Sequence, residues 1–411
     1  MSRGGRPRRL HELARAVGLG VLLFVGVAAL GEAIGFAVFL ARGGAGTIGE
    51  HAGLGWLYVL VFHGVPVDIA PADARIVTAT RVTFALLLPT LLIVWLAFVA
   101  GRAVAREAVG PAPWRIVVAL VVAVPYAAAS FVLSNLVSVR LDLVVTDNLF
   151  GGPVTLMPDP SETLLRTFAA VAIPAVVGAL AAVRRPDLRA VHRVYAVVAG
   201  GARMFALALL LAFVGLLVNA GADPDAARAY LSAVAEPSPA GTATIVGHHV
   251  LALPNQSVWV LVPAMGGSDE LRVNATDQTI VSYGATIAEI GVAAPNGTAT
   301  PPIVSTEPLP RWYLLFLLVP ALATFLGGSR AAQVARSLAG ALALGAAAGV
   351  VFAGLVALGS ALSEIAYRAN LAGGEALTVA AGPDLRSGLV VALAWGVAGG
   401  AIGGWRRWIR A

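Results

Sequence analysis

Residues 16–40 read AVGLGVLLFVGVAALGEAIGFAVFL, an apolar run with a single charged side chain, Glu32. A helix that crosses the hydrocarbon core of a bilayer needs about 20 such residues, because each residue advances the helix by about 1.5 Å. The arginines in front of the run are Arg3, Arg6, Arg8, Arg9 and Arg15. Cleaved signal peptides also place a basic stretch before an apolar one, but their apolar region is shorter. We therefore expect a first membrane helix here.

Seven more apolar runs of similar length follow along the chain. The composition agrees with them, since 58% of the residues are hydrophobic and 12% are charged, whereas soluble domains carry about 25% charged residues. The sequence therefore predicts an all-α polytopic membrane protein with about eight transmembrane helices. The further runs are 82–100, 114–138, 164–183, 194–218, 312–327, 335–361 and 387–404.

The arginines favour one orientation of these helices. They gather in every second loop and at both ends of the chain, and basic residues mark cytoplasmic loops. We expect both termini to be cytoplasmic, in the plasma membrane of a prokaryote. The net charge of +6 is then an orientation signal, and no nucleic-acid partner is expected. Beyond the N-terminal group, the arginines concerned are Arg102, Arg106, Arg115, Arg184, Arg185, Arg189, Arg193, Arg330, Arg336, Arg406, Arg407 and Arg410.

Two residue types are absent from the sequence. Without cysteine, disulfides, thiolate metal sites and cysteine nucleophiles are excluded. Without lysine there is no Walker A loop and no Schiff-base cofactor. We expect no cofactor, and no ATPase within the chain.

Four segments are expected along the chain. The longest loop outside the membrane predicts a small α/β or β insertion, with a helical stretch over 224–234 and β-type runs at 258–262 and 271–273. The segments are a cytoplasmic basic tail (1–15), the first five helices (16–218), the extracytoplasmic domain (219–311), and the last three helices with the cytoplasmic C-terminus (312–411).

Three N-x-S/T sequons lie in the extracytoplasmic segment, at Asn255, Asn274 and Asn296. They are candidate glycosylation sites, although such triplets also arise by chance in segments rich in threonine.

An internal repeat is the most specific feature of the sequence. Four glycine turns, each followed by a short alternating strand, begin near Gly64, Gly151, Gly266 and Gly373. Each lies between an outgoing and a returning helix, which predicts four parallel two-helix repeats with short extracytoplasmic strands. An aspartate follows each strand and is expected to cap the next helix, although four aspartates could also ring a cation entry. These aspartates are Asp73, Asp159, Asp277 and Asp384.

Three returning helices also share a proline, at Pro89, Pro174 and Pro320. A proline inside a helix removes a backbone hydrogen bond and kinks the helix. A common kink would support common descent of the units.

Glu32 is the candidate polar residue inside the membrane. An ionisable group at this depth costs free energy, so it usually faces the bundle interior or a partner. It could titrate a proton or bind substrate; it could equally be a protonated or paired glutamate packed between small residues.

No catalytic or metal-binding constellation is visible. The adjacent His248 and His249 would point to opposite faces of a strand and cannot clamp one metal ion. His11-Glu12 begins like a zinc-protease motif but lacks the second histidine. Ser360 has no histidine in a neighbouring helix core to act as its base.

Glycine spacing predicts close helix packing, either inside the bundle or across an interface with a second copy or a membrane partner. The glycines at this spacing are Gly31/Gly35, Gly345/Gly349 and Gly396/Gly400/Gly404.

The function that these features favour is a transport-type permease or membrane component for an apolar or weakly charged substrate. The alternative is a non-catalytic envelope scaffold that binds a partner through residues 219–311. A lipid-modifying enzyme ranks last, because no catalytic group is visible.

Overall fold

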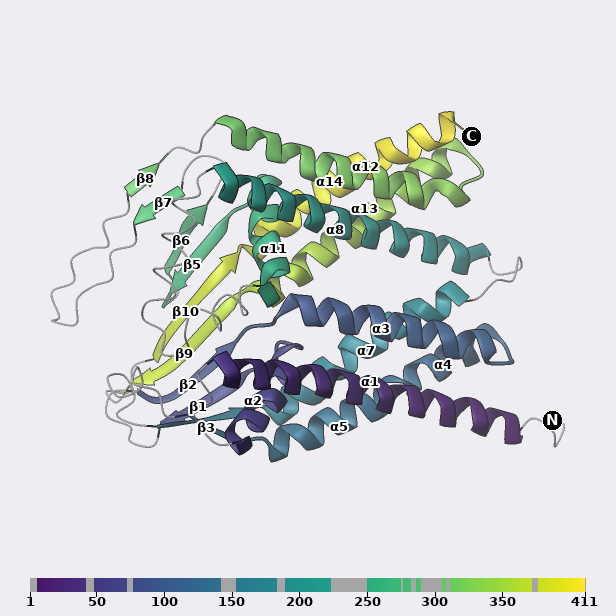
Figure 1. Cartoon of the computed structure of the whole chain (residues 1–411). Helices are drawn as coiled ribbons and strands as arrows, with labels where there is room; N and C mark the ends of the chain where they lie inside the picture. The colour runs from purple at the N-terminus through teal and green to yellow at the C-terminus, as the bar shows by residue number, and fades with distance from the viewer. Residues whose placement is uncertain are drawn as a thin grey trace. The chain divides into compact units, whose positions relative to one another are not determined.

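The computed structural model describes residues 6–41, 48–71, 77–141, 153–182, 189–222, 250–274, 276–281, 286–289, 305–307, 311–371 and 376–410. The chain divides into two compact units (Figure 1). Unit 1 comprises residues 1–195, 220–255 and 365–377, and unit 2 comprises residues 196–219, 256–364 and 378–411. The segment 219–311 is thus shared between the two units.

Eight helices in the described residues are long and apolar enough to cross a membrane, which confirms the polytopic membrane class. In unit 1 they are α1 (Arg6–Ala41), α3 (Leu87–Glu107), α4 with α5 (Ala112–Val121 and Ala123–Leu136) and α7 (Pro160–Ala182). In unit 2 they are α8 (Arg189–Ala222, of which 196–219 belong to this unit), α12 (Leu318–Ala331, within a helical span of Leu314–Val334), α13 (Leu338–Ser363) and α14 (Leu385–Ile409).

Two short helices were not expected from the sequence. In unit 1, α2 (Ile48–Val61) lies between α1 and the first strand. In unit 2, α11 (Leu253–Ala264, of which 256–264 belong to this unit) precedes the strands. The prediction of a β-type run at 258–262 is therefore wrong, because these residues lie inside α11. Its alternating Val and Leu residues fit a buried helix as well as a strand, and short apolar runs do not separate the two by pattern. The stretch 224–234 lies outside the described residues.

Antiparallel strands gather beyond one end of the helices in each unit (Figure 1). In unit 1 the order is β3-β4-β1-β2-β9, and in unit 2 it is β10-β5-β6-β7-β8. The unit 1 strands are β1 (Val67–Pro71), β2 (Val77–Thr83), β3 (Val139–Leu141), β4 (Val154–Pro158) and β9 (Ile365–Leu371). Those of unit 2 are β5 (Asp269–Val273), β6 (Thr276–Val281), β7 (Thr286–Glu289), β8 (Ser305–Glu307) and β10 (Ala376–Pro383).

The same turn connects the short helix to its strand in both units. Gly64 (φ 66°) and Gly266 (φ 96°) adopt left-handed conformations that a side chain would strain. Their N–H groups donate to Val61 O (2.9 Å) and to Pro263 O (2.8 Å). This is the glycine C-cap that ends a helix by satisfying its last carbonyls.

The link from the sheet to the next long helix is also shared. The N–H of Asp159 donates to Pro66 O at 3.0 Å, and the N–H of Asp384 donates to Ser268 O at 2.8 Å. In the strand register, Val67 lies opposite Pro158, and Asp269 lies opposite Pro383. The pair β1–β4, which leads into α7, and the pair β5–β10, which leads into α14, therefore have equivalent registers.

Two of the four repeat aspartates are helix caps. Asp159 accepts from the N–H of Ser161 (2.9 Å) at the start of α7, and Asp384 accepts from the N–H of Ser387 (2.7 Å) at the start of α14. The cap predicted at Asp277 is wrong, because this residue lies inside β6, opposite Arg272. Asp73 lies outside the described residues.

The four glycine segments are of two kinds. Strands β1 and β5 follow a short helix and its glycine turn, whereas β4 and β10 lead through a capping aspartate directly into α7 and α14. Glycines 151 and 373 lie outside the described residues. The described geometry thus matches in pairs, first with third and second with fourth, and not four times over.

Close helix contacts also match between the units. A Cβ on Gly178 of α7 would clash with the carbonyl oxygen of Phe98 on α3, and a Cβ on Gly403 of α14 would clash with that of Phe325 on α12. Gly345 and Gly349 of α13 meet Gly400 and Gly396 of α14 in the same way. These glycine faces are therefore used inside unit 2, where they bring backbones together.

The three prolines do not occupy the same place in their helices. Pro174 lies inside α7. Pro89 is the third residue of α3, and Pro320 is the third residue of α12. The first turn of an α-helix has no hydrogen bonds to lose, so Pro89 is tolerated there without a kink. Pro320 lies inside a longer helical span, because α12 directly follows a 3-10 helix (Arg311–Leu317).

Gly349→Ala and Gly354→Ala test the packing of α13. The added methyl at Gly349 would clash with the backbone of Gly396, whereas Gly354 has open space around it. We expect Gly349→Ala to lower the thermal unfolding midpoint in detergent, because overpacking costs about 1–3 kcal/mol. Gly354→Ala should leave it unchanged or raise it, since alanine is the better helix former. Equal effects of the two changes would contradict this packing.

Candidate functional site

An apolar cavity of about 220 Å³ lies in unit 1 between α2 and the sheet. The lining of α2 follows the spacing of one helix face, i, i+3, i+4 and i+7. The strands contribute one face of the sheet, since Val67 pairs with Val82 and Ile69 pairs with Leu156. The lining residues are Leu54, Leu57, Tyr58, Val61, Val67, Ile69, Val82, Phe84 and Leu156.

The size of this cavity limits what it can hold. Pockets for complete drug-sized ligands measure about 300–1,000 Å³, and an apolar cavity of about 150 Å³ holds benzene. A space of about 220 Å³ therefore fits one apolar group or a segment of acyl chain. Only Tyr58 offers a polar atom from its side chain among the lining residues, so the cavity suits an uncharged group.

An ionic cluster lies on the other face of the same strands. Asp68 alternates with Val67 and Ile69 along β1, so its side chain points away from the cavity. Arg81 of β2 donates from Nε to Asp68 at 2.7 Å and from Nη2 to Asp159 at 2.6 Å. The arginine thereby ties the β1–β2 hairpin to the capping residue of α7.

The charge of Asp159 is held by its surroundings. The Ser161 hydroxyl, the N–H groups of Glu162 and Ser161, and the Arg81 guanidinium lower the pKa of Asp159 to about 2, although partial burial acts in the opposite direction. A carboxylate with this many donors stays ionised throughout the physiological range. Its role is to fix the sheet on α7, and with it the floor of the cavity.

A buried histidine–tyrosine pair joins the turn after α2 to α5. His63 Nδ1 lies 2.8 Å from Val59 O, and its Nε2 lies 2.9 Å from the hydroxyl of Tyr126 on α5. A carbonyl oxygen can only accept, so Nδ1 carries the proton and Nε2 accepts from the tyrosine. Tyr126 is fully buried and His63 is 3% exposed. All polar atoms of the two rings are satisfied, so the pair fixes the turn after α2 against α5.

Glu32 is placed between α1 and α2. The Cα of Glu32 is 2.8 Å from where a Cβ on Gly55 would lie, so the two helices are in close contact here. Its Oε1 is buried and has no hydrogen-bond partner among the described residues. Neither Glu32 nor Gly55 is among the residues that line the apolar cavity.

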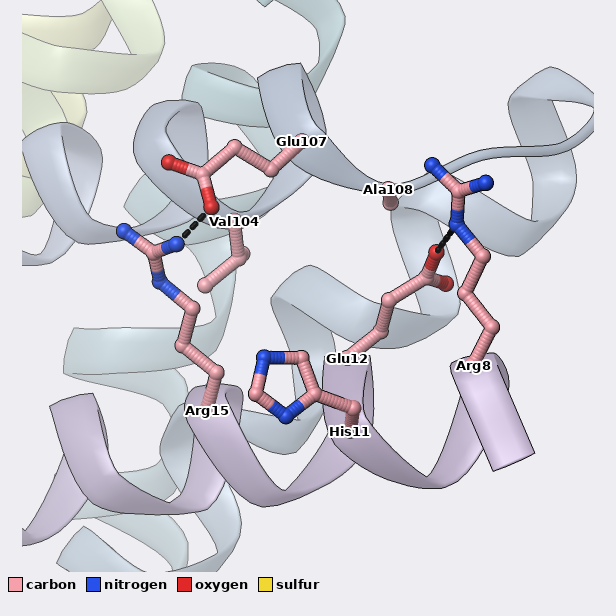
Figure 2. A pocket seen from close by; sticks show the side chains of 7 residues that line it. All are labelled: Arg8, His11, Glu12, Arg15, Val104, Glu107 and Ala108. Atoms are coloured by element: carbon pink, nitrogen blue, oxygen red, sulfur yellow. Dashed lines mark ion pairs between the residues drawn. The ribbon is translucent and has the colours of Figure 1, made fainter.

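A charged pocket of about 260 Å³ lies at the opposite end of unit 1, between the start of α1 and the end of α3 (Figure 2). Arg15 pairs with Glu107, and Arg8 Nε is 4.0 Å from Glu12. His11 lies between the two ion pairs (Figure 2).

Glu12 is the central acceptor of this pocket. Its two oxygens accept from the N–H of Val109 at 2.9 Å and from the indole of Trp114 at 2.7 Å. The charged groups thus join the start of α1 to the end of α3 and the start of α4. Among the described residues no group of three or more histidines, aspartates or glutamates is placed to hold a metal ion.

Two of the candidate glycosylation sites lie in the described residues. Asn255, in unit 1, donates from Nδ2 to Ala85 O at 2.6 Å and accepts from the N–H of Leu87 at 2.9 Å. Asn274 has φ 48° and accepts from the N–H of Thr378 at 2.9 Å. Asn296, like His248 and His249, lies outside the described residues.

Comparison with known proteins gives no match: no family model, no curated protein and no solved structure is similar to this chain.

Tyr126→Phe tests the buried pair. The change leaves His63 Nε2 buried without a donor, and an unsatisfied buried group costs about 1–3 kcal/mol. We expect a lower thermal unfolding midpoint in detergent. The double variant His63→Leu/Tyr126→Phe should lose less than the sum of the two single changes, because both partners of the hydrogen bond are then removed. Strictly additive losses would show that the bond contributes nothing.

Proposed function

We propose that this chain is a transport-type membrane protein that binds an apolar or lipid-like group in the cavity between α2 and the sheet of unit 1. The observation that carries the proposal is the cavity lining, in which one face of a helix and one face of three strands turn apolar side chains towards the same space. Lone apolar side chains on a surface need no explanation, but an apolar cavity with convergent walls is the usual form of a ligand site.

The placement of charge supports an uncharged substrate. The ionised side chains of the hairpin, Asp68 and Arg81, pair with each other on the far side of the strands. The polar side chains nearest to α2 on its other faces, Glu32 and His63, do not line the cavity. A charged ligand in this cavity would lose its hydration without gaining a partner.

The chain is further proposed to descend from a duplication of one unit of four long helices. The matched glycine C-caps, the matched Asp159 and Asp384 links and the matched α3–α7 and α12–α14 crossings support this. The chain begins and ends on the same side of the membrane when a unit has an even number of membrane helices, so both copies would have the same orientation.

The proposed orientation places the strands outside the cell. The ends of α3 and α14 carry arginines, Arg106 in one case and Arg406 with Arg407 in the other, at the ends remote from the strands. Arginine-rich ends favour the cytoplasm. In this orientation the cavity lies near the outer face of a plasma membrane.

Filling the cavity tests the function. The probe is a phospholipid with a photoreactive diazirine in its acyl chain, and the full-length protein is reconstituted with it in nanodiscs. We expect cross-links to peptides that contain Leu54–Val61 or Leu156, and Leu156→Trp should reduce them several-fold because the indole occupies the space. The matched control is Leu165→Trp on α7, where the leucine is 67% exposed.

The same variants separate transport from the scaffold alternative. If cells that lack the protein show a defect, and Leu156→Trp restores growth as well as the wild type while cross-linking is lost, ligand binding is dispensable. A scaffold role through residues 219–311 would then be favoured. If Leu156→Trp fails and Leu165→Trp succeeds, the cavity is the functional site.

A further inference from the structure

The start of β5 in unit 2 is the counterpart of the start of β1, which lines the cavity of unit 1, and the polarity of this position differs between the units. Aligning the two glycine C-caps, Gly64 with Gly266, places Asp269 of β5 at the position of Val67 of β1. The strand register gives the same match, since Val67 lies opposite Pro158 and Asp269 lies opposite Pro383. Val67 is 5% exposed and Asp269 is 3% exposed. A carboxyl group therefore occupies a place that is apolar in unit 1.

The carboxyl group of Asp269 is buried without compensation. Its Oδ1 is inaccessible and has no hydrogen-bond partner among the described residues. The neighbouring α11 has no charged residue, and neither does β10. An unpaired carboxylate in such a place is costly, so the group is neutral or takes up a cation.

No ion pair to Asp269 is present among the described residues. On β5 itself, Glu270 and Arg272 lie on the opposite face of the strand from Asp269. Arg272 forms an ion pair with Glu364. At the start of α14, Asp384 is engaged as the helix cap. The remaining charged residues of the adjoining elements are Arg386 at the start of α14, Arg406 and Arg407 at its far end, and Asp277 on β6.

We propose that Asp269 is a proton-binding site of unit 2, in which the buried carboxyl group holds a proton at neutral pH. Burial raises the pKa of Asp269 to about 8. The geometry gives the reason. The equivalent position of unit 1 buries an apolar side chain, Val67, and the protonated form of aspartate is the one that an apolar, buried environment favours. This site is independent of the cavity proposed for ligand binding in unit 1.

Dicyclohexylcarbodiimide tests the protonation state directly. A protonated, buried carboxyl group adds across one C=N bond of the reagent, and the acyl group then shifts to nitrogen and leaves a stable N-acylurea. The full-length protein in native membranes is labelled between pH 6 and pH 10, and mass spectrometry locates the adduct. We expect labelling of Asp269 that, relative to other labelled carboxyl groups, falls about tenfold for each pH unit above its midpoint.

The matched variants are Asp269→Asn and Glu270→Gln. The first should abolish the adduct on this peptide, and the second should leave it unchanged. An unlabelled Asp269 at pH 6 in a protein that unfolds at its normal temperature would overturn the proposal. So would labelling that sodium ions block and pH does not change, because the site would then bind a metal cation.

Thermal unfolding at different pH values gives a second readout. A carboxyl group with a raised pKa in the folded state contributes stability that is present below the pKa of the unfolded chain, near 4, and is lost as the pH rises towards 8. The unfolding midpoint of the wild type should therefore fall across this range. Asp269→Asn is neutral at every pH and should reduce the fall; an unchanged slope in a folded variant contradicts the proposal.

Discussion

The backbone hydrogen bond from Asp159 N–H to Pro66 O joins the strands of unit 1 to a long helix, and the remaining features of that unit depend on it. It fixes the last residue of β4 beside the first residues of β1, which sets the register of the two strands. The side chain of Asp159 then caps α7 and receives Arg81 from β2. Register, helix start and hairpin position are thereby determined together. The cavity exists because this arrangement holds one face of the sheet opposite α2.

The helices themselves are held by close backbone contact. Within a bilayer, apolar side chains gain little by leaving lipid for protein, so association depends on packing and on small residues that let helices approach. Gly101 with Ala175, and Gly328 with Gly400, are contacts of this kind. They explain why a chain with 46 glycines can be helical over most of its long segments: glycine lowers helix propensity, but here it permits tertiary contact.

The two units show how one backbone arrangement can carry different polarity. The position of Val67 in unit 1 lines an apolar cavity, whereas the position of Asp269 in unit 2 buries a carboxyl group. The buried polar pair of unit 1 is elsewhere, at His63 and Tyr126, and it is fully satisfied. Similar hydrogen bonds and registers thus fix where side chains are placed, and single residues at those places decide whether a buried position is apolar or polar.

The eight long helices follow from the sequence alone, because the length of an apolar run is a local property that can be compared directly with the thickness of a bilayer. The aspartates that cap α7 and α14 and the strand at 271–273 are also local signals. The sequence did not determine α2 and α11, since a short apolar run fits a buried helix or a strand equally well. The cavity, the Arg81–Asp159 contact and the isolation of Asp269 required the tertiary structure. Each depends on which strand pairs with which and in what register, and such pairing joins residues far apart in the chain that no local pattern connects.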